Sequence, residues 1–185
     1  MGSKLRIAVF GVAAAVMAVG IGAIAPAAYA GSTATTFTLT GGTLSITVPT
    51  GTVSIGSVAT GSPTVSGALG STSVSDQRGA LSAIWTVSVT STDFTTGAAS
   101  ANETVPKANV AYASGASTST TGTGVFTPGT IPSLSASNVV PGPAWAGVGV
   151  NTAAWNPTMT VILLNSNSTA AVVGTYSGSI GQSVA

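Results

Sequence analysis

The sequence predicts an all-β protein, an antiparallel Ig-like β-sandwich of about nine short strands preceded by a signal peptide. About a third of residues 31–185 are Ser or Thr, and Thr, Ser and Val alternate over short runs, which is typical of strands with one solvated face. The 24 Gly and 9 Pro residues divide the chain into short segments. After residue 30 no stretch shows a helical period of useful length. A helix-free barrel is the main alternative architecture.

The N-terminal segment has the features of a secretory signal peptide. Lys4 and Arg6 precede a long uncharged apolar run, which ends at a proline, and Ala28-Tyr29-Ala30 then matches the small-residue pattern of a cleavage site. A transmembrane anchor is the alternative, because the apolar run is almost long enough to span a bilayer. We therefore predict a signal peptide over residues 1–30 and a single β-sandwich domain over residues 31–185.

The best-defined strand is predicted at residues 84–90, where Trp85, Val87 and Val89 fall on one face and polar residues on the other. A second strand, at residues 43–48, alternates in the same way. Further strands are expected at Phe37–Leu39, Val53–Ile55, Val110–Tyr112, Met159–Leu164 and Tyr176–Ile180, with weaker candidates near Val65, Val74 and Val125. The strand at Met159–Leu164 contains successive apolar residues, which predicts burial on both faces.

Two segments are predicted to lie outside the strands. Residues Ser114–Gly124 form a Ser/Thr/Gly tract with little apolar content, which indicates a mobile loop. Residues Thr127–Pro157 hold five prolines among small residues, which favours a long irregular connection.

The charge inventory excludes several classes of function. The whole chain has four basic and three acidic residues and no His or Cys. Zinc, haem and iron–sulfur sites need His or Cys ligands, and a Ser-His-Asp or Cys-His site needs a histidine base. After residue 30 only Arg78 and Lys107 are basic, too few to neutralise the several phosphates that a nucleic-acid binder contacts. The sequence predicts no cofactor, no metal and no nucleic-acid partner.

Few residues are candidates for a functional site. Asp76 and Arg78, beside a glycine, are interpreted as a local ion pair in an Asx-type turn. The alternative is that this polar pair binds a glycan or a peptide. Trp85 lies on the apolar face of its strand and is interpreted as a core residue. Trp145 and Trp155 are the better physical candidates for a sugar-binding surface, because tryptophan offers a large contact area at low entropic cost.

The three acidic residues do not indicate catalysis. Glycoside hydrolysis needs two carboxyl groups about 5–10 Å apart across a groove. Nothing in the spacing of Asp76, Asp93 and Glu103 predicts such a pair. We therefore expect no enzymatic activity.

The stretch from Val74 to Phe94, which contains Trp85-Thr86-Val87, resembles the WxL-type surface domain of Gram-positive bacteria. The resemblance covers about Thr43 to Ala185. It implies a β-sandwich that attaches non-covalently to peptidoglycan and assigns Trp85 and Val87 to that attachment. Val87 stands where the family has Leu, and the family's second Trp-x-Leu element is not found after Tyr176.

The leading hypothesis is a secreted, non-catalytic surface protein that associates with peptidoglycan or another cell-wall glycan. After signal cleavage it would have no membrane contact. One alternative is a self-assembling subunit of a surface layer or fibre, because a nearly uncharged β-protein has little electrostatic defence against pairing of strand edges. Another is a glycan-binding module released into the medium.

Overall fold

The computed structural model describes residues 32–135, 140–163 and 171–185, with the backbone alone for Val140 and Pro141. The predicted all-β class is confirmed, because every strand pairing is antiparallel and the described residues contain no α-helix. The strands are β1 (Leu44–Thr47), β2 (Thr64–Ala68), β3 (Thr72–Asp76), β4 (Ala83–Ser91), β5 (Phe94–Thr95), β6 (Thr104–Val105), β7 (Val110–Ala113), β8 (Ser117–Thr127), β9 (Thr130–Ile131), β10 (Val140–Trp155), β11 (Thr158–Ile162) and β12 (Ile180–Val184). Two short 3-10 helices, Ala101–Glu103 and Lys107–Asn109, flank β6.

The compact part of the molecule is Leu39–Ala185, and Met1–Thr38 form a separate unit. Of the unit Met1–Thr38, the structure describes residues 32–38, and these have no regular secondary structure. The predicted signal peptide, residues 1–30, lies outside the described residues.

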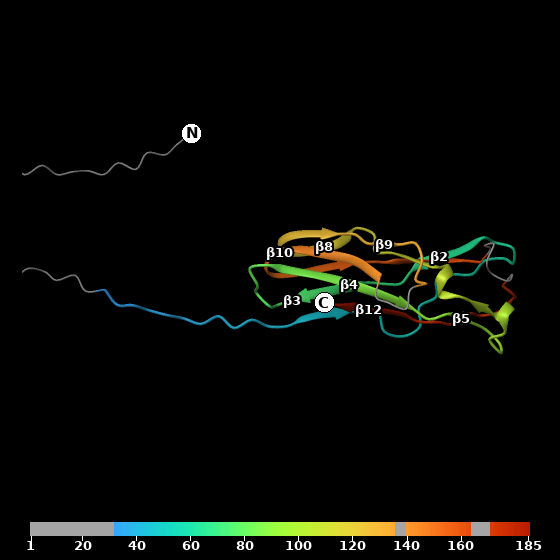
Figure 1. Ribbon diagram of the computed structural model, residues 1–185. Coiled ribbons are helices and arrows are strands. Elements are labelled where there is room, and N and C mark those ends of the chain that lie inside the picture. Colours follow the sequence, from blue (N-terminus) through green and yellow to red (C-terminus); the bar gives the residue numbers. More distant parts are fainter. Residues whose placement is uncertain (1–31, 136–139, 164–170) are drawn as a thin grey trace, which may run out of the picture. The chain divides into compact units, whose positions relative to one another are not determined.

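The largest sheet has the strand order β1-β3-β10-β4-β12, and β8 also pairs with β10 (Figure 1). Both β8 and β10 double back within their length. The pair Val148 and Thr123 is followed in the register by the pair Thr152 and Thr121. Gly122 and Gly149 lie at the two bends and have positive φ values of 93° and 69°. Such φ values favour glycine.

The bends divide this sheet into two stacked layers. One layer contains β12, β4, the first half of β10 and residues 123–127 of β8. The other contains β1, β3, the second half of β10 and residues 117–121 of β8. The four-stranded sheet β2-β11-β7-β9 extends the second layer. In the chain β2 is followed by β3, β10 by β11, and β7 by β8, and these neighbours stand in the same order in the two sheets. The result is a sandwich-like arrangement.

The core lies between the layers and is built around three tryptophans. The Trp85 ring stacks on Trp145 of the neighbouring strand, with 6.3 Å between ring centroids, and on Trp155 of the opposite layer, with 6.4 Å. Phe126 completes the aromatic group at 5.4 Å from Trp155. Tyr112 reaches across the layers to donate a hydrogen bond of 2.9 Å from its hydroxyl to Gln182 Oε1.

Two segments predicted to be irregular are strands, so those predictions are wrong. The Ser/Thr/Gly tract at Ser114–Gly124 contributes most of β8, and Thr127–Pro157 contains the 16-residue β10. The low apolar content of β8 does not prevent strand formation, because β-branched Thr suits a strand and β10 supplies the hydrogen-bond partners.

Other strand predictions fail in part. Phe37–Leu39 and Val53–Ile55 are not strands, and the second segment is flanked by Gly51 and Gly56, which have positive φ values. The last strand begins at Ile180, later than predicted. The strand β11 alternates between buried and less buried residues, so the prediction that both of its faces are buried is wrong for this range, and Leu164 lies outside the described residues.

Candidate functional site

The four apolar residues proposed from the sequence for ligand contact lie in the core. Trp85, Trp145 and Trp155 are 1%, 2% and 0% exposed, and Val87 is 0% exposed. The interpretation of Trp85 as a core residue is confirmed. The expectation that Trp145 and Trp155 lie near the surface is wrong, because β10 carries both side chains into the space between the layers.

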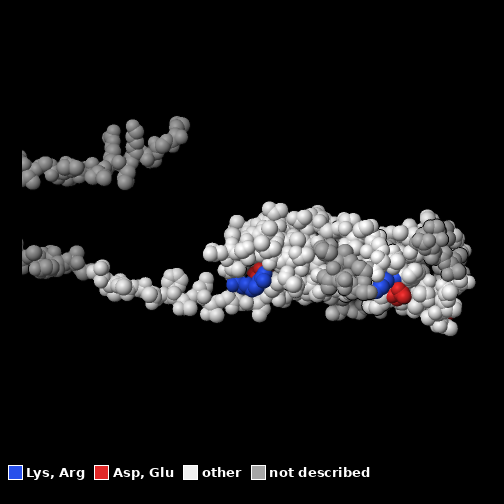
Figure 2. Space-filling model, in the orientation of Figure 1, with Lys and Arg blue, Asp and Glu red and all other residues white. Residues whose placement is uncertain are grey.

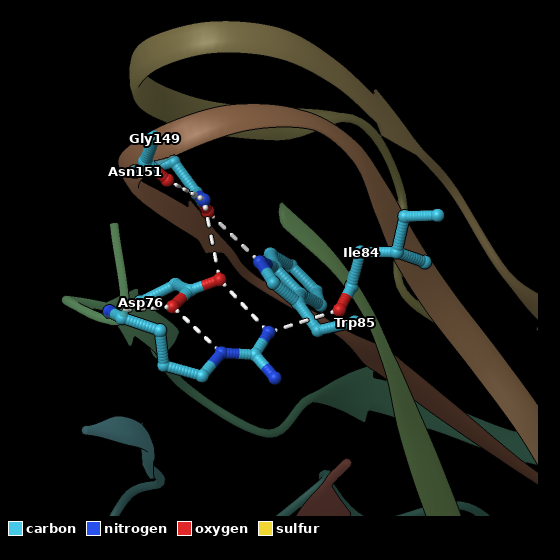
Figure 3. A network of polar contacts seen from close by, with 6 residues as sticks. Asp76, Ile84, Trp85, Gly149 and Asn151 are labelled. Atoms are coloured by element: carbon cyan, nitrogen blue, oxygen red, sulfur yellow. Dashed lines mark hydrogen bonds and ion pairs between the residues drawn. The ribbon is translucent and has the colours of Figure 1, made fainter. Parts of the chain in front are cut away.

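Asp76 and Arg78 form the local ion pair that the sequence predicts, at the end of β3 (Figure 3). The Arg78 guanidinium donates two hydrogen bonds of 2.9 Å, one to each carboxylate oxygen of Asp76. The Arg78 backbone N–H donates a third, of 3.0 Å, to Asp76 Oδ1, which closes an Asx-type turn. Arg78 also donates to the Ile84 carbonyl at 2.9 Å, so the guanidinium bridges the ends of β3 and β4.

This pair continues into the core through Asn151. The Asn151 amide donates to Asp76 Oδ2 and to the Gly149 carbonyl, over 3.4 Å each, while its oxygen accepts a hydrogen bond of 2.8 Å from Trp85 Nε1. Figure 3 shows this chain of contacts beside the bend of β10. The network therefore joins the β3–β4 turn, the β10 bend and the central tryptophan.

The carboxylate of Asp76 is stabilised in its charged form. Hydrogen bonding from the Arg78 side chain lowers the pKa of Asp76 below its ordinary value, although burial acts in the opposite direction. The Asp76 side chain is 0% exposed, whereas that of Arg78 is 38% exposed. The sequence alone does not reveal Asn151 as the third member, because it lies 75 positions from Asp76.

The other two carboxylates also accept hydrogen bonds from backbone N–H groups. Asp93 Oδ1 accepts a hydrogen bond of 2.7 Å from the Lys107 backbone N–H. Glu103 Oε2 accepts one of 3.0 Å from the Ser100 N–H in a capping box, and hydrogen bonds from Ser100 lower the pKa of Glu103. The described residues contain no group of three or more acidic, His or Cys side chains that could hold a metal ion.

The described part of the chain forms a cavity of about 1080 Å³. It lies between the loop that follows β1 and the segment that precedes β12. Its apolar lining comes from Val65, Phe94, Val105, Met159, Val161 and Leu163, among others. Its rim is rich in Ser, Thr and Gly from residues 51–62 and 174–179.

Four apolar side chains at this rim are open to solvent. Val53 and Val58 on the first loop are 41% and 46% exposed, and Val172 and Val173 opposite are 41% and 83% exposed. Large exposed apolar groups gathered at a cavity mark a site of binding more often than scattered ones do. Sequence reasoning missed this site because it assigned Val53–Ile55 to a strand.

The polar lining of the cavity is supplied mainly by uncharged groups. Gln182 lines it, and its side chain is held by the Tyr112 hydroxyl. Burial raises the pKa of Tyr112 to about 12, so this hydroxyl remains protonated at neutral pH and can donate. Tyr176 also lines the cavity, and its single hydroxyl proton is shared between the carbonyls of Asn102 and Val172, at 3.2 and 3.0 Å.

Charged side chains are sparse on the molecular surface. Figure 2 shows one face, on which Lys, Arg, Asp and Glu are confined to small spots and uncharged residues cover the rest. No charged side chain occurs in the sequence after Lys107. A ligand at the cavity would therefore be recognised by shape, apolar contact and hydroxyl or backbone hydrogen bonds.

Comparisons of the chain with protein-family models, curated proteins and solved structures find no match. Among the described residues, no helix has the length and apolar character needed to cross a membrane.

Proposed function

We propose that this protein is a secreted, non-catalytic surface protein that associates non-covalently with the bacterial cell wall. The observation that carries the proposal is the cavity, with its apolar lining, hydroxyl-rich rim and exposed valines. The predicted signal peptide and the resemblance of the Trp85-Thr86-Val87 region to WxL-type domains support the location.

The chemistry of the cavity suits the uncharged parts of a polymer that carries small apolar groups. Peptidoglycan offers N-acetyl methyl groups, alanine side chains, hydroxyls and amides. Apolar groups would contact the valines, while Ser and Thr hydroxyls and Gln182 would exchange hydrogen bonds with the glycan or its peptide. We assign wall contact to the cavity rather than to Trp85 and Val87, because both of those side chains are buried.

The environment of the acidic residues supports a non-catalytic function. Asp76 is held by Arg78 and Asn151, Asp93 by the Lys107 N–H, and Glu103 by Ser100. A hydrolase of the paired-carboxylate type needs two such groups facing one substrate. Here the three carboxylates are hydrogen-bonded to separate partners within the protein.

We expect Val58→Arg to weaken co-sedimentation of the mature protein with purified Gram-positive peptidoglycan by at least about tenfold, which corresponds to about 1.4 kcal/mol of binding free energy. The reason is that a charged side chain at the rim would be desolvated against an apolar contact. Wild-type binding should change little between low and high salt, because few charges are available to screen.

The matched control is Leu81→Arg, which introduces the same charge at a residue that is 94% exposed and does not line the cavity. Leu81→Arg should bind like wild type. Equal binding by both variants would reject the cavity as the contact surface. Absence of wild-type binding would reject wall association, and binding only to soluble glycans would favour a released module.

A further inference from the structure

The strand β8 is an open edge of the sandwich. Within the residues that the structure describes, β8 pairs with β10 alone, so its other edge has no strand partner. Its two arms, residues 117–121 and 123–127, end the two layers on the same side of the sandwich. All side chains from Thr118 to Val125 are exposed, and Val125 is 67% exposed.

This edge has few of the features that prevent strand pairing. Proteins usually protect an edge strand with a charged side chain, a proline, a short length or a cover. The 11 residues of β8 include no charged residue and no proline. The neighbouring strand β10 also contains no charged residue. Two irregularities interrupt the strand. One is the bend at Gly122, and the other is a register shift at Thr118, because Ala154 pairs with Ser119 and Trp155 with Ser117. Residues 119–121 and 123–127 pair with β10 without interruption.

An apolar row leads across the outer face of one layer to this edge. Ile84 of β4 lies opposite Ala146 of β10, and Ala146 lies opposite Val125 of β8. Ile84 is 58% exposed, so the row is open to solvent as far as the last strand. A further strand beside Val125 would continue it.

We propose that β8 is a homodimer interface, in which each arm pairs antiparallel with the same arm of a second copy. A two-fold axis perpendicular to the layers, passing near Ser119 and Val125, generates both pairings at once and extends both layers. Such an interface is self-complementary, and each copy supplies the backbone donors and acceptors that the other lacks. The two Val125 side chains then form a cross-strand pair.

The second copy is favoured over another protein by the chemistry of the edge. An uncharged edge cannot select a partner through charge complementarity, so its pairing depends on backbone hydrogen bonds and matching side-chain size. Thr, Ser and Val of moderate size face one another in the symmetric arrangement. This proposal does not depend on wall binding, because β8 does not line the cavity.

The first test measures the mass of the exported protein against concentration by sedimentation equilibrium. Wild type should reach twice the monomer mass. The double variant Ser119→Lys, Val125→Lys should raise the dimer dissociation constant at least about tenfold, because like charges meet across the axis. The control, Ser45→Lys with Ser183→Lys, adds the same charge on exposed residues of β1 and β12 and should dimerise like wild type.

A second test uses the absence of cysteine from the chain. Under mild oxidation Val125→Cys should form a covalent dimer, because directly opposite Cβ atoms in an antiparallel pair lie near disulfide distance. Ser45→Cys should stay largely monomeric. The proposal is overturned by a wild-type monomer at all concentrations, by dimers that withstand the β8 lysines, or by equal disruption from the β1 and β12 lysines. Near-ultraviolet circular dichroism establishes that each variant is folded.

Discussion

Trp155→Ala is expected to lower the free energy of unfolding by about 3–5 kcal/mol, the usual cost of truncating a large buried aromatic side chain. Trp155 is 0% exposed, and its ring packs against Trp85 of the opposite layer and against Phe126. Its Nε1 donates a hydrogen bond of 3.1 Å to the Tyr112 hydroxyl, which the substitution also removes. Urea unfolding followed by far-ultraviolet circular dichroism measures the change.

Two further variants make this result interpretable. Trp155→Phe keeps an aromatic ring and should lose less stability than the alanine variant, and it gives a value if the alanine variant does not fold. Phe37→Ala truncates an aromatic side chain that is 91% exposed and should change stability by less than about 0.5 kcal/mol. A loss below about 1 kcal/mol in Trp155→Ala would contradict the position of this ring at the centre of the core.

The sequence was sufficient to predict the fold class and the strands with strong alternation. The strand around Trp85 and Val87 extends over Ala83–Ser91, close to the predicted range. The failures lie where tertiary pairing decides the structure. The Ser/Thr tract of β8 and the proline-containing first half of β10 form strands because each supplies the other's hydrogen-bond partners, which no local pattern reveals.

The candidate site was less predictable than the fold. The Asp76–Arg78 pair is local and was predictable from turn chemistry, whereas Asn151 joins it only through the β3–β10 pairing. Trp145 was expected near the surface because its neighbours are proline, alanine and glycine. Its burial depends on the pairing of Trp145 with Trp85, which brings the two rings together. The cavity arises from two loops distant in sequence, so no motif marks it.

We expect Asp76→Asn to lower the free energy of unfolding by about 2 kcal/mol at neutral pH. The substitution replaces a charged acceptor of hydrogen bonds from Arg78 and Asn151 with an amide that has one acceptor oxygen. Breaking a fully buried ion pair costs about 3–5 kcal/mol. The effect here is smaller because the Arg78 side chain is 38% exposed and solvent screens the pair.

The pH dependence tests the same network independently. Because the pKa of Asp76 in the folded protein lies below its ordinary value of 3.8, the unfolded chain takes up the proton first as the pH falls. The contribution of Asp76 is therefore present above about pH 4 and is lost as the pH drops through the lowered pKa. Wild type should lose stability in this range more steeply than Asp76→Asn, and the two unfolding free energies should converge towards pH 2.

Asp93→Asn is the matched control, because it makes the same chemical change at an exposed carboxylate that accepts one backbone hydrogen bond. Below pH 4 the unfolding free energy of Asp93→Asn should follow that of wild type more closely than the unfolding free energy of Asp76→Asn does. Glu103, whose pKa is also lowered, is unchanged in both variants, so its contribution cancels in the comparison. Parallel profiles for wild type and Asp76→Asn would contradict a stabilising charge on Asp76. Convergence would instead show that the charged form of Asp76 stabilises the folded protein.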